Sequence, residues 1–189
     1  MQTALIIFAA LFAPIPWFIT GIHFLIKTQR WSSGNLNWFL IVLLFLSWGI
    51  LLWWGLKNSS IVFENLFAFL PLHVLGVVVL LAATIIEILT SKTLGVSRVF
   101  GSSELKQKKD DRLITSGIYA YARHPRYLEH PFWALGLGLL FGSPFLLWFS
   151  LYMFISFSIT AYFEEQELLL RYGKEYLEYK KKVPAFFIV

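Results

Sequence analysis

Cysteine is absent from the 189-residue sequence, and charged residues make up only 14% of it. The lack of thiols excludes disulfide bonds, thiolate metal sites and cysteine nucleophiles. This composition, with few charges, 58% hydrophobic residues and a mean hydropathy of +0.67, is too apolar for an ordinary soluble domain. The sequence therefore predicts one all-α domain that is embedded in the lipid bilayer as a polytopic integral membrane protein.

The net charge of +5 comes from basic residues that lie between and after the apolar stretches. Anionic lipid headgroups are the nearest partner for basic residues in such places. Binding to nucleic acid is therefore not expected.

The apolar stretches predict five transmembrane helices, because each is long enough to cross the hydrocarbon core. The first run is too long for a cleaved secretory signal, so it is expected to be retained. The fourth helix would begin near Arg126 and turn at Gly142-Ser143-Pro144 into the fifth. The expected helices lie near residues 4–26, 37–56 and 66–90, with a tight hairpin over residues 126–163.

Basic residues are distributed very unevenly around these helices. Of the 16 Lys and Arg residues, all but Lys57 fall after the first helix, between residues 91 and 129, or in the carboxy-terminal tail. Basic residues are retained on the cytoplasmic side of a membrane. The pattern predicts a multi-pass protein with its amino terminus outside and its carboxy terminus and both long polar segments in the cytoplasm.

The longest polar segment, residues 91–129, carries the side chains best suited to chemistry. Pro125 disfavours helix at His124, which predicts a rigid, extended elbow where the chain enters the membrane. Arg123 can bind a carboxylate or a phosphate, and His124 and Tyr127 can form hydrogen bonds beside it. From these residue types alone, anchoring to lipid headgroups is the simpler interpretation.

Three acidic residues, Glu164, Glu165 and Glu167, directly follow the fifth predicted helix in an otherwise basic region. They could pair with arginines of the polar segment or accept the ribose hydroxyls of a nucleotide-like cofactor. A solvated helical turn with one ion pair is the plainer alternative. Apolar residues spaced by three and four from Leu168 to Val183 predict a basic amphipathic helix on the membrane surface.

Four short motifs occur in order along the second half of the chain. They are LITSGIY at residues 113–119, RHPRY at 123–127, EEQEL at 164–168 and YGKEYLEYKKKVP at 172–184. In this order and at these separations they resemble the isoprenylcysteine carboxyl methyltransferases. The first three predicted helices show only hydropathy and add nothing to the resemblance.

The resemblance implies a membrane enzyme that binds S-adenosylmethionine in a cytoplasmic pocket closed by the carboxy-terminal segment. Residues 1–90 would form a membrane scaffold and give access to a lipid-like acceptor, and residues 91–189 would form the catalytic part of the same domain. Arg123 and His124 would be catalytic. The implied cofactor contacts are Asp111, Arg112, Leu113, Ile114, Tyr119, His124, Pro125, Arg126, Tyr127, Glu164 and Glu165, with Glu104 as a further polar contact.

Methyl transfer from a sulfonium is an in-line displacement that needs positioning and the exclusion of water, so no metal is expected. A carboxylate acceptor is already a nucleophile, whereas an amine must first lose a proton and no dedicated base stands out. Eukaryotic members place an arginine, thought to meet the substrate carboxylate, where this chain has Thr160. The acceptor therefore stays open between a prenylcysteine, a lipid amine, a small thiol and another amphiphile.

Gly136 and Gly138 form a G-x-G like that of phospholipid methyltransferases, although close helix packing is the expected role of small residues there. His23 and Glu87 lie within apolar stretches near their predicted inner ends, where anchoring at the interface is expected.

Two other functions are compatible with parts of this pattern. Membrane sterol reductases that use NADPH share a related R-H-P-x-Y elbow, but the pair Glu164-Glu165 would repel a 2′-phosphate. A non-catalytic scaffold would use its basic loops to recruit anionic lipid. In a scaffold, replacing Arg123, His124 or Glu164 by alanine would change no ligand binding.

Overall fold

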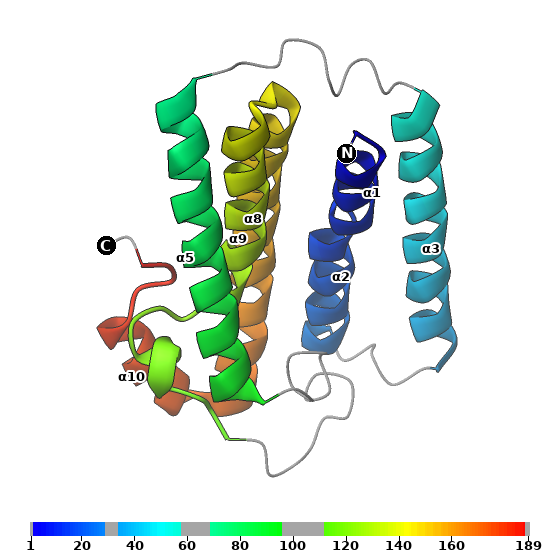
Figure 1. Ribbon diagram of the computed structural model, residues 1–189. Coiled ribbons are helices and arrows are strands. Elements are labelled where there is room, and N and C mark those ends of the chain that lie inside the picture. The colour runs from blue at the N-terminus through cyan, green and yellow to red at the C-terminus, as the bar shows by residue number, and fades with distance from the viewer. Residues whose placement is uncertain (1, 29–33, 58–68, 96–111, 188–189) are drawn as a thin grey trace.

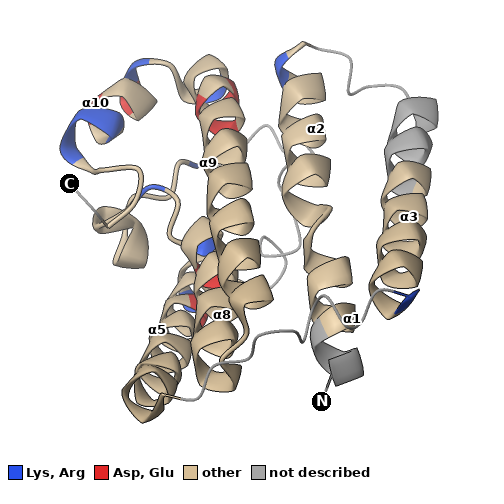
Figure 2. Ribbon diagram, turned by 90° about the horizontal axis from the view of Figure 1, so that it is seen from above, with Lys and Arg blue, Asp and Glu red and all other residues tan. Residues whose placement is uncertain are grey.

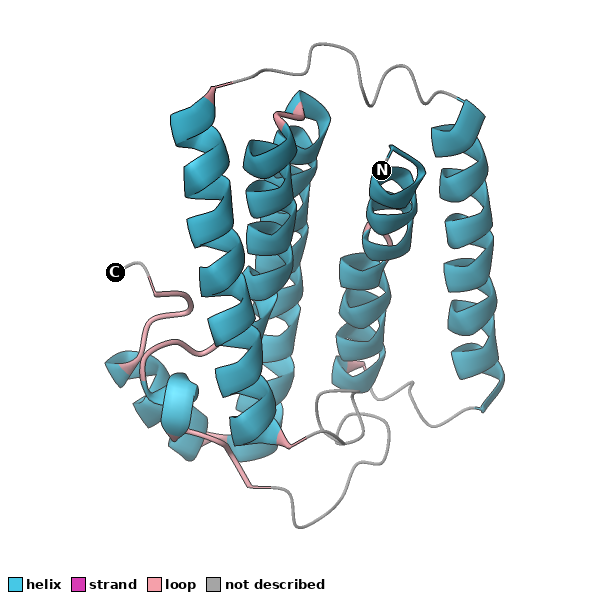
Figure 3. Cartoon of the chain, viewed as in Figure 1, coloured by secondary structure: helices cyan, strands magenta, loops and turns pink. Residues whose placement is uncertain are grey.

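The computed structural model describes residues 2–28, 34–57, 69–95 and 112–187. Within these ranges every regular element is a helix, as Figure 3 shows, which confirms the predicted all-α class. The elements are α1 (Gln2–Phe12), α2 (Ile15–Lys27), α3 (Gly34–Lys57), α5 (Leu70–Leu94), the 3-10 turn η1 (Gly117–Ala120), α8 (Arg126–Phe141), α9 (Pro144–Tyr172) and α10 (Lys174–Lys182).

The long helices form a bundle in which α5 packs on α8, α8 on α9, and α9 on α2 (Figure 1). Three described segments, Ile6–Lys27, Leu70–Leu94 and Pro144–Tyr172, are long and apolar enough to cross a membrane. The apolar part of α3 whose side chains are described, Val42–Lys57, is shorter, and α8 has 16 residues. The count of five spanning helices therefore remains a prediction.

The first predicted span, residues 4–26, agrees with the apolar segment Ile6–Lys27, but this segment is divided into α1 and α2. Pro14 has no backbone N–H to give to the preceding turn, and the chain turns at Ala13 and Pro14. The hydroxyl of Tyr152 donates to the Ala13 carbonyl over 2.8 Å, and the Trp17 indole N–H donates to that hydroxyl over 2.9 Å. Side chains thus satisfy the backbone at the break.

Glycines bring α5 and α8 into backbone contact. A Cβ atom at Gly76 would lie 2.5 Å from the backbone nitrogen of Leu140, and one at Gly136 would lie 2.7 Å from Cγ of Leu80. A Cβ atom at Gly138 would meet a leucine of α9 at 2.8 Å. The packing role expected for Gly136 and Gly138 is therefore confirmed.

The hairpin between α8 and α9 turns where the sequence predicts. Gly142 has a left-handed φ of 64°, which a residue with a Cβ atom rarely adopts. The Ser143 side chain accepts a hydrogen bond from the Leu146 backbone N–H over 3.4 Å, and Pro144 begins α9. The start of α8 at Arg126 also agrees with the sequence analysis.

The carboxy-terminal part differs from the prediction in where the fifth helix ends. The fifth helix does not end at residue 163, because α9 continues to Tyr172 and includes all three acidic residues. The amphipathic helix predicted over residues 168–183, with Gly173 as an interruption, is divided at that glycine, which has a φ of 55°. After this break α10 returns toward α9, and its Tyr176 and Tyr179 are buried (Figure 1).

Candidate functional site

The elbow before α8 is held by the carboxy-terminal segment. The backbone N–H of Arg123 donates to the Pro184 carbonyl, and that of His124 donates to the Ala185 carbonyl, each over 2.9 Å. The backbone at these two residues is free for such bonds because Pro125 keeps the preceding residue out of helix. The elbow is non-helical, as the sequence predicts for the residue before Pro125, and it bends at Arg123.

Arg123 joins three parts of the chain through its guanidinium. Its Nε and Nη2 atoms donate to Oε1 of Glu165 over 2.9 and 2.5 Å. Its Nη1 atom donates to the carbonyls of Lys180, over 3.2 Å, and Val183. The Lys180 ammonium also contacts Oε2 of Glu165 at 2.5 Å. These contacts confirm the expected pairing of an acidic residue with Arg123, and they direct the guanidinium toward the protein itself.

His124 lies between two carboxylates and is only 4% exposed. Its Nδ1 atom is 3.0 Å from Oε2 of Glu164, and its Nε2 atom is 3.3 Å from Oε1 of Glu165. Burial by itself lowers the pKa of His124, but hydrogen bonding and charge from Glu164 and then Glu165 outweigh it, so the pKa is raised above its ordinary value. The protonated ring can donate to both carboxylates at once.

Aromatic rings fix the orientation of this imidazole. The His124 and Tyr127 rings are stacked with an interplanar angle of 4° and centroids 5.6 Å apart. Tyr127 stacks in turn on Phe157 of α9, with centroids 5.1 Å apart. Tyr127 is also a hydrogen-bonding partner of Glu164. The elbow, α8 and the end of α9 therefore form one rigid wall.

A cavity of about 130 Å³ lies against this wall, between the elbow segment, the end of α9 and α10. Nine residues that the sequence analysis assigned to the site line it: Arg112, Leu113, Ile114, Tyr119, Arg123, His124, Arg126, Tyr127 and Glu164. Pro125 and Glu165 do not line it, although Glu165 supports Arg123 and His124 from behind. Asp111 and Glu104 lie outside the described residues.

Sequence reasoning did not assign six further residues that line the cavity: Leu94, Leu168, Arg171, Tyr172, Tyr176 and Tyr179. The tyrosines belong to the fourth motif, and Leu168 and Arg171 follow Glu164 at helical spacings of four and seven. That spacing would have placed them on the same face as Glu164 had α9 been extended past residue 163. These two residues were missed because the fifth helix was predicted to end at residue 163.

The cavity is rich in tyrosines that remain neutral. Burial is the main cause that raises the pKa values of Tyr119, Tyr176 and Tyr179 far above the ordinary value. The Tyr179 hydroxyl donates to the Tyr119 carbonyl over 2.6 Å and so ties α10 to η1. The cavity thus offers neutral phenols and arginines as hydrogen-bond donors, and the carboxylate of Glu164 as an acceptor.

Three residues discussed from the sequence lie away from the cavity lining. His23 is buried against α9, where its Nδ1 atom is 2.6 Å from Oε2 of Glu167, so the expected anchoring at the interface is wrong. Hydropathy gave no sign that this face of α2 meets α9. Thr160 is fully buried, with its hydroxyl 2.8 Å from that of Thr20. Glu87 is exposed on α5, and its anchoring role stays a prediction.

Comparisons with known proteins match the part of the chain that builds this wall. The family model for phospholipid methyltransferases matches residues 71–175, from the first turn of α5 to the first residues of α10. A protein-S-isoprenylcysteine O-methyltransferase from Xenopus laevis is 31% identical over 135 residues, covering 70% of this chain and 46% of that protein. No solved structure matches the chain significantly.

Shorter matches agree with this result. The protein-S-isoprenylcysteine O-methyltransferase of Schizosaccharomyces pombe is 44% identical over 81 residues, which are 42% of this chain and 34% of that protein. The protein of the same name from Homo sapiens is 38% identical over 74 residues, or 39% of this chain and 26% of that protein. The chain spans less than half the length of each of these relatives.

Proposed function

The chain belongs to the phospholipid methyltransferase family, and we propose that it is a membrane enzyme that methylates the carboxylate of an S-isoprenylcysteine, with S-adenosylmethionine as methyl donor. The observation that carries the proposal is the group formed by the buried His124 and Tyr127 and the half-buried Glu164 at the wall of the cavity. The names of the similar proteins supply the acceptor, since each is a protein-S-isoprenylcysteine O-methyltransferase.

The residues around the cavity fit this methyl donor. Glu164 can accept hydrogen bonds from ribose hydroxyls or an ammonium group, and the arginines can bind a carboxylate. Apolar side chains such as Leu113 and Ile114 can contact a purine ring. When bound, the donor supplies an electrophilic methyl group on a sulfonium. We assign its contacts to Asp111, Arg112, Leu113, Ile114, Tyr119, the run from His124 to Tyr127, and Glu164, with Glu165 supporting them.

The protein's own residues act by positioning and by excluding water. His124 keeps Glu164 fixed at the wall, which preserves the carboxylate for the donor without a rearrangement on binding. Arg123 directs its guanidinium to Glu165 and to two carbonyls of the carboxy-terminal segment. We therefore give Arg123 a positioning role that holds this segment over the cavity, and we assign no proton transfer to it.

The acceptor carboxylate needs no general base, because it is already ionised at neutral pH. Its approach to a sulfonium is electrostatically favourable, and more so where water is excluded. The buried tyrosines at the cavity keep their protons, since burial raises the pKa values of Tyr176 and Tyr179. They can therefore donate hydrogen bonds without competing as nucleophiles.

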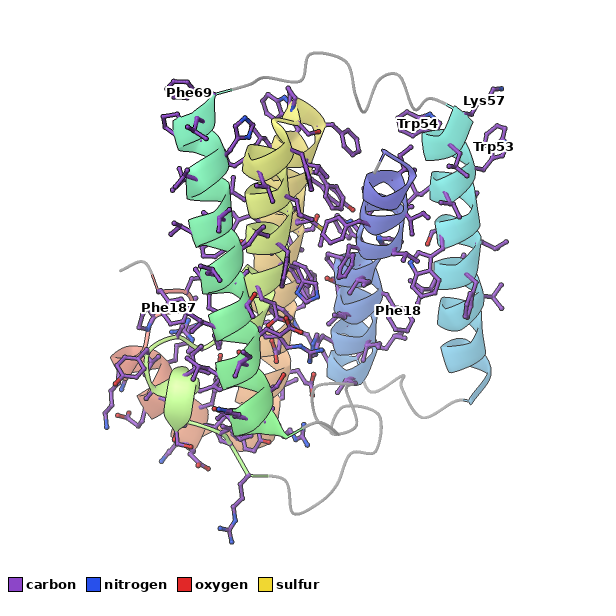
Figure 4. All side chains as sticks on the ribbon, viewed as in Figure 1. Phe18, Trp53, Trp54, Lys57, Phe69 and Phe187 are labelled. Atoms are coloured by element: carbon purple, nitrogen blue, oxygen red, sulfur yellow. The ribbon has the colours of Figure 1, made fainter. Side chains whose placement is uncertain are left out.

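We place the cavity on the cytoplasmic side of the membrane, with the amino terminus outside and five spanning helices. The ends of α2, α5 and α9 lie at the same end of the bundle as α10 (Figure 1). Figure 2 shows basic residues on α10 and mixed charges near the end of α9. Lys57, the basic residue expected outside, lies beside Trp53 at the opposite end of the bundle, the end at which α5 begins (Figure 4).

Calorimetry with detergent-purified protein tests the proposed donor. We expect S-adenosylmethionine to bind the wild type, and Glu164→Ala and His124→Ala to lose most of this binding. Glu178→Ala is the matched control, because Glu178 is exposed on α10 and pairs with Lys181. Saturable NADPH binding without donor binding would favour a reductase instead. Unchanged donor binding in both site variants would contradict the assigned contacts.

Transfer of a labelled methyl group to S-isoprenylcysteine tests the proposed acceptor. The matching carboxamide presents the same isoprenyl chain without an ionised oxygen nucleophile, so it should not be methylated. Equal labelling of both compounds would rule out the carboxylate as the acceptor.

A further inference from the structure

A buried histidine–carboxylate contact joins α2 to α9 next to the cavity. His23 Nδ1 lies 2.6 Å from Oε2 of Glu167, and the two side chains are only 3% and 6% exposed. Burying such groups carries a desolvation cost that their attraction often fails to repay. Ionisable residues in membrane helices commonly serve function for this reason. The pair therefore calls for an explanation beyond helix packing.

Packing of α2 on α9 is already provided by neutral groups. Near the middle of α2, the Thr20 and Thr160 hydroxyls are 2.8 Å apart, and both are buried. The Thr160 hydroxyl also lies 3.1 Å from the Pro16 carbonyl. These contacts join the two helices through neutral groups, so the docking of α2 on α9 does not rest on the pair of His23 and Glu167 alone.

The second carboxylate oxygen of Glu167 contacts a residue that lines the cavity. Oε1 of Glu167 is 3.7 Å from Nη1 of Arg171, one turn farther along α9. The Arg171 guanidinium lies 5.4 Å from the ring centroid of Tyr172, and both residues line the cavity. One carboxylate thus links a histidine of α2 to a guanidinium at the cavity wall.

The charges around Arg171 suggest what this link does. Glu164, one turn before Glu167, is the carboxylate of the cavity and lies within electrostatic range of His23. A guanidinium at the wall needs a fixed counter-charge behind it, or it will turn toward Glu164. Glu167 supplies that charge, and its second oxygen is held in place by His23.

We propose that Arg171 binds a ligand carboxylate in the cavity, and that His23, acting through Glu167, is the positioning residue that holds Arg171 there. A guanidinium has five N–H donors in a planar fork and binds carboxylates with two parallel hydrogen bonds. The proposal rests on the proposed function, in which both the methyl donor and the acceptor carry a carboxylate. It makes α2, which lies outside the matched family segment, part of the site.

The first test uses Arg171→Gln to decide whether Arg171 binds the carboxylate of the methyl donor or that of the acceptor. If it belongs to the donor, the variant should bind S-adenosylmethionine about tenfold to a hundredfold more weakly, as expected for a lost charged hydrogen bond. Its affinity for decarboxylated S-adenosylmethionine should equal that of the wild type. If the carboxylate belongs to the acceptor, donor affinity should hold and KM for S-isoprenylcysteine should rise by a similar factor. Lys181→Gln, an exposed change on α10, serves as the control.

The second test asks whether His23 acts through Arg171. In the wild-type background, His23→Leu should weaken the binding of the same ligand by about threefold to tenfold, because the contact between Arg171 and the carboxylate is partly lost. It should have no further effect when combined with Arg171→Gln. His23→Gln, whose amide can donate to Glu167, should restore much of the affinity. A merely structural role would give the same penalty in both backgrounds.

Two results would overturn the inference while leaving the proposed function intact. The first is that the wild type binds the donor and Arg171→Gln changes neither the Kd for the donor nor the KM for the acceptor. The other is an undiminished His23→Leu penalty in the Arg171→Gln background. Wild-type protein that binds no S-adenosylmethionine would remove the proposed function, and the inference would fall with it.

Discussion

His124 Nδ1 and Glu164 Oε2 lie 3.0 Å apart, and this contact joins the elbow before α8 to the last turns of α9. The second ring nitrogen faces Glu165, so the imidazole is held from both sides. A histidine placed between two carboxylates is stabilised in its protonated form. The charge state of His124 therefore links the stability of the fold to that of the proposed cofactor wall.

The raised pKa of His124 predicts a pH dependence of stability. Below the ordinary pKa of about 6.5, the ring is protonated in both the folded and the unfolded protein, and the stabilisation is complete. Above it, the unfolded chain releases the proton while the folded protein keeps it, so stability falls until pH passes the raised pKa. Thermal unfolding in detergent across this range should show the decline. His124→Gln should flatten it, and an equal slope in that variant would contradict the assignment.

Removal of the charge on Glu165 should loosen the carboxy-terminal segment. Glu165→Gln leaves the buried Arg123 without its ionic partner and releases Lys180, at a cost of about 3 kcal/mol. Thermal unfolding should shift accordingly, and trypsin should cut more rapidly at the basic end of α10. Glu178→Gln removes an exposed acid from the same helix and should change neither measurement. Unchanged trypsin resistance in Glu165→Gln would show that other contacts hold the segment.

The contact between α5 and α8 should not tolerate a side chain at Gly76. Gly76→Ala places a methyl group 2.5 Å from the Leu140 backbone nitrogen, and relief of that clash should cost about 1–3 kcal/mol. Gly49→Ala is the matched control, since a Cβ atom there meets no atom within 4 Å. The control should be neutral or stabilising by up to about 1 kcal/mol. Equal unfolding temperatures for the two variants would contradict the backbone contact.

The absence of cysteine makes the proposed topology directly testable. A single cysteine at Lys57 should react with a membrane-impermeant maleimide added to intact cells, and one at Lys181 should react only after the membrane is opened. Both positions lie at ends of helices, at opposite ends of the bundle (Figure 1). The reverse order of labelling would invert the orientation, and labelling of both from one side would reject the expected number of crossings.

Local signals predicted much of this architecture. Pro125 predicted the non-helical elbow, and Gly142, Ser143 and Pro144 marked the hairpin turn, because each acts on the backbone next to it. Pairing of Glu165 with an arginine was one of the alternatives that the sequence left open for the acidic residues, because opposite charges attract. These features depend on a few neighbouring residues or on charge alone, so they can be read without knowing how the helices pack.

Features that depend on tertiary packing escaped the sequence analysis. His23 and Glu167 are 144 positions apart, and hydropathy does not reveal which face of α2 meets α9. The acidic residues after Phe163 suggested the end of a spanning helix. In the structure their partners come from α2 and the elbow, and these contacts stabilise the continuation of α9. The sequence does not reveal these partners, so it placed the end of the helix too early.

The bonds from Arg123 and His124 to the carbonyls of Pro184 and Ala185 involve only main-chain atoms. Any residue can supply a carbonyl, so this latch does not depend on which side chains the tail carries. It depends on how many residues separate Gly173 from Pro184, because one residue more or fewer would present a different carbonyl to each amide. These two bonds thus set no requirement on the side chains at positions 184 and 185, but they constrain the length of the segment that follows Gly173.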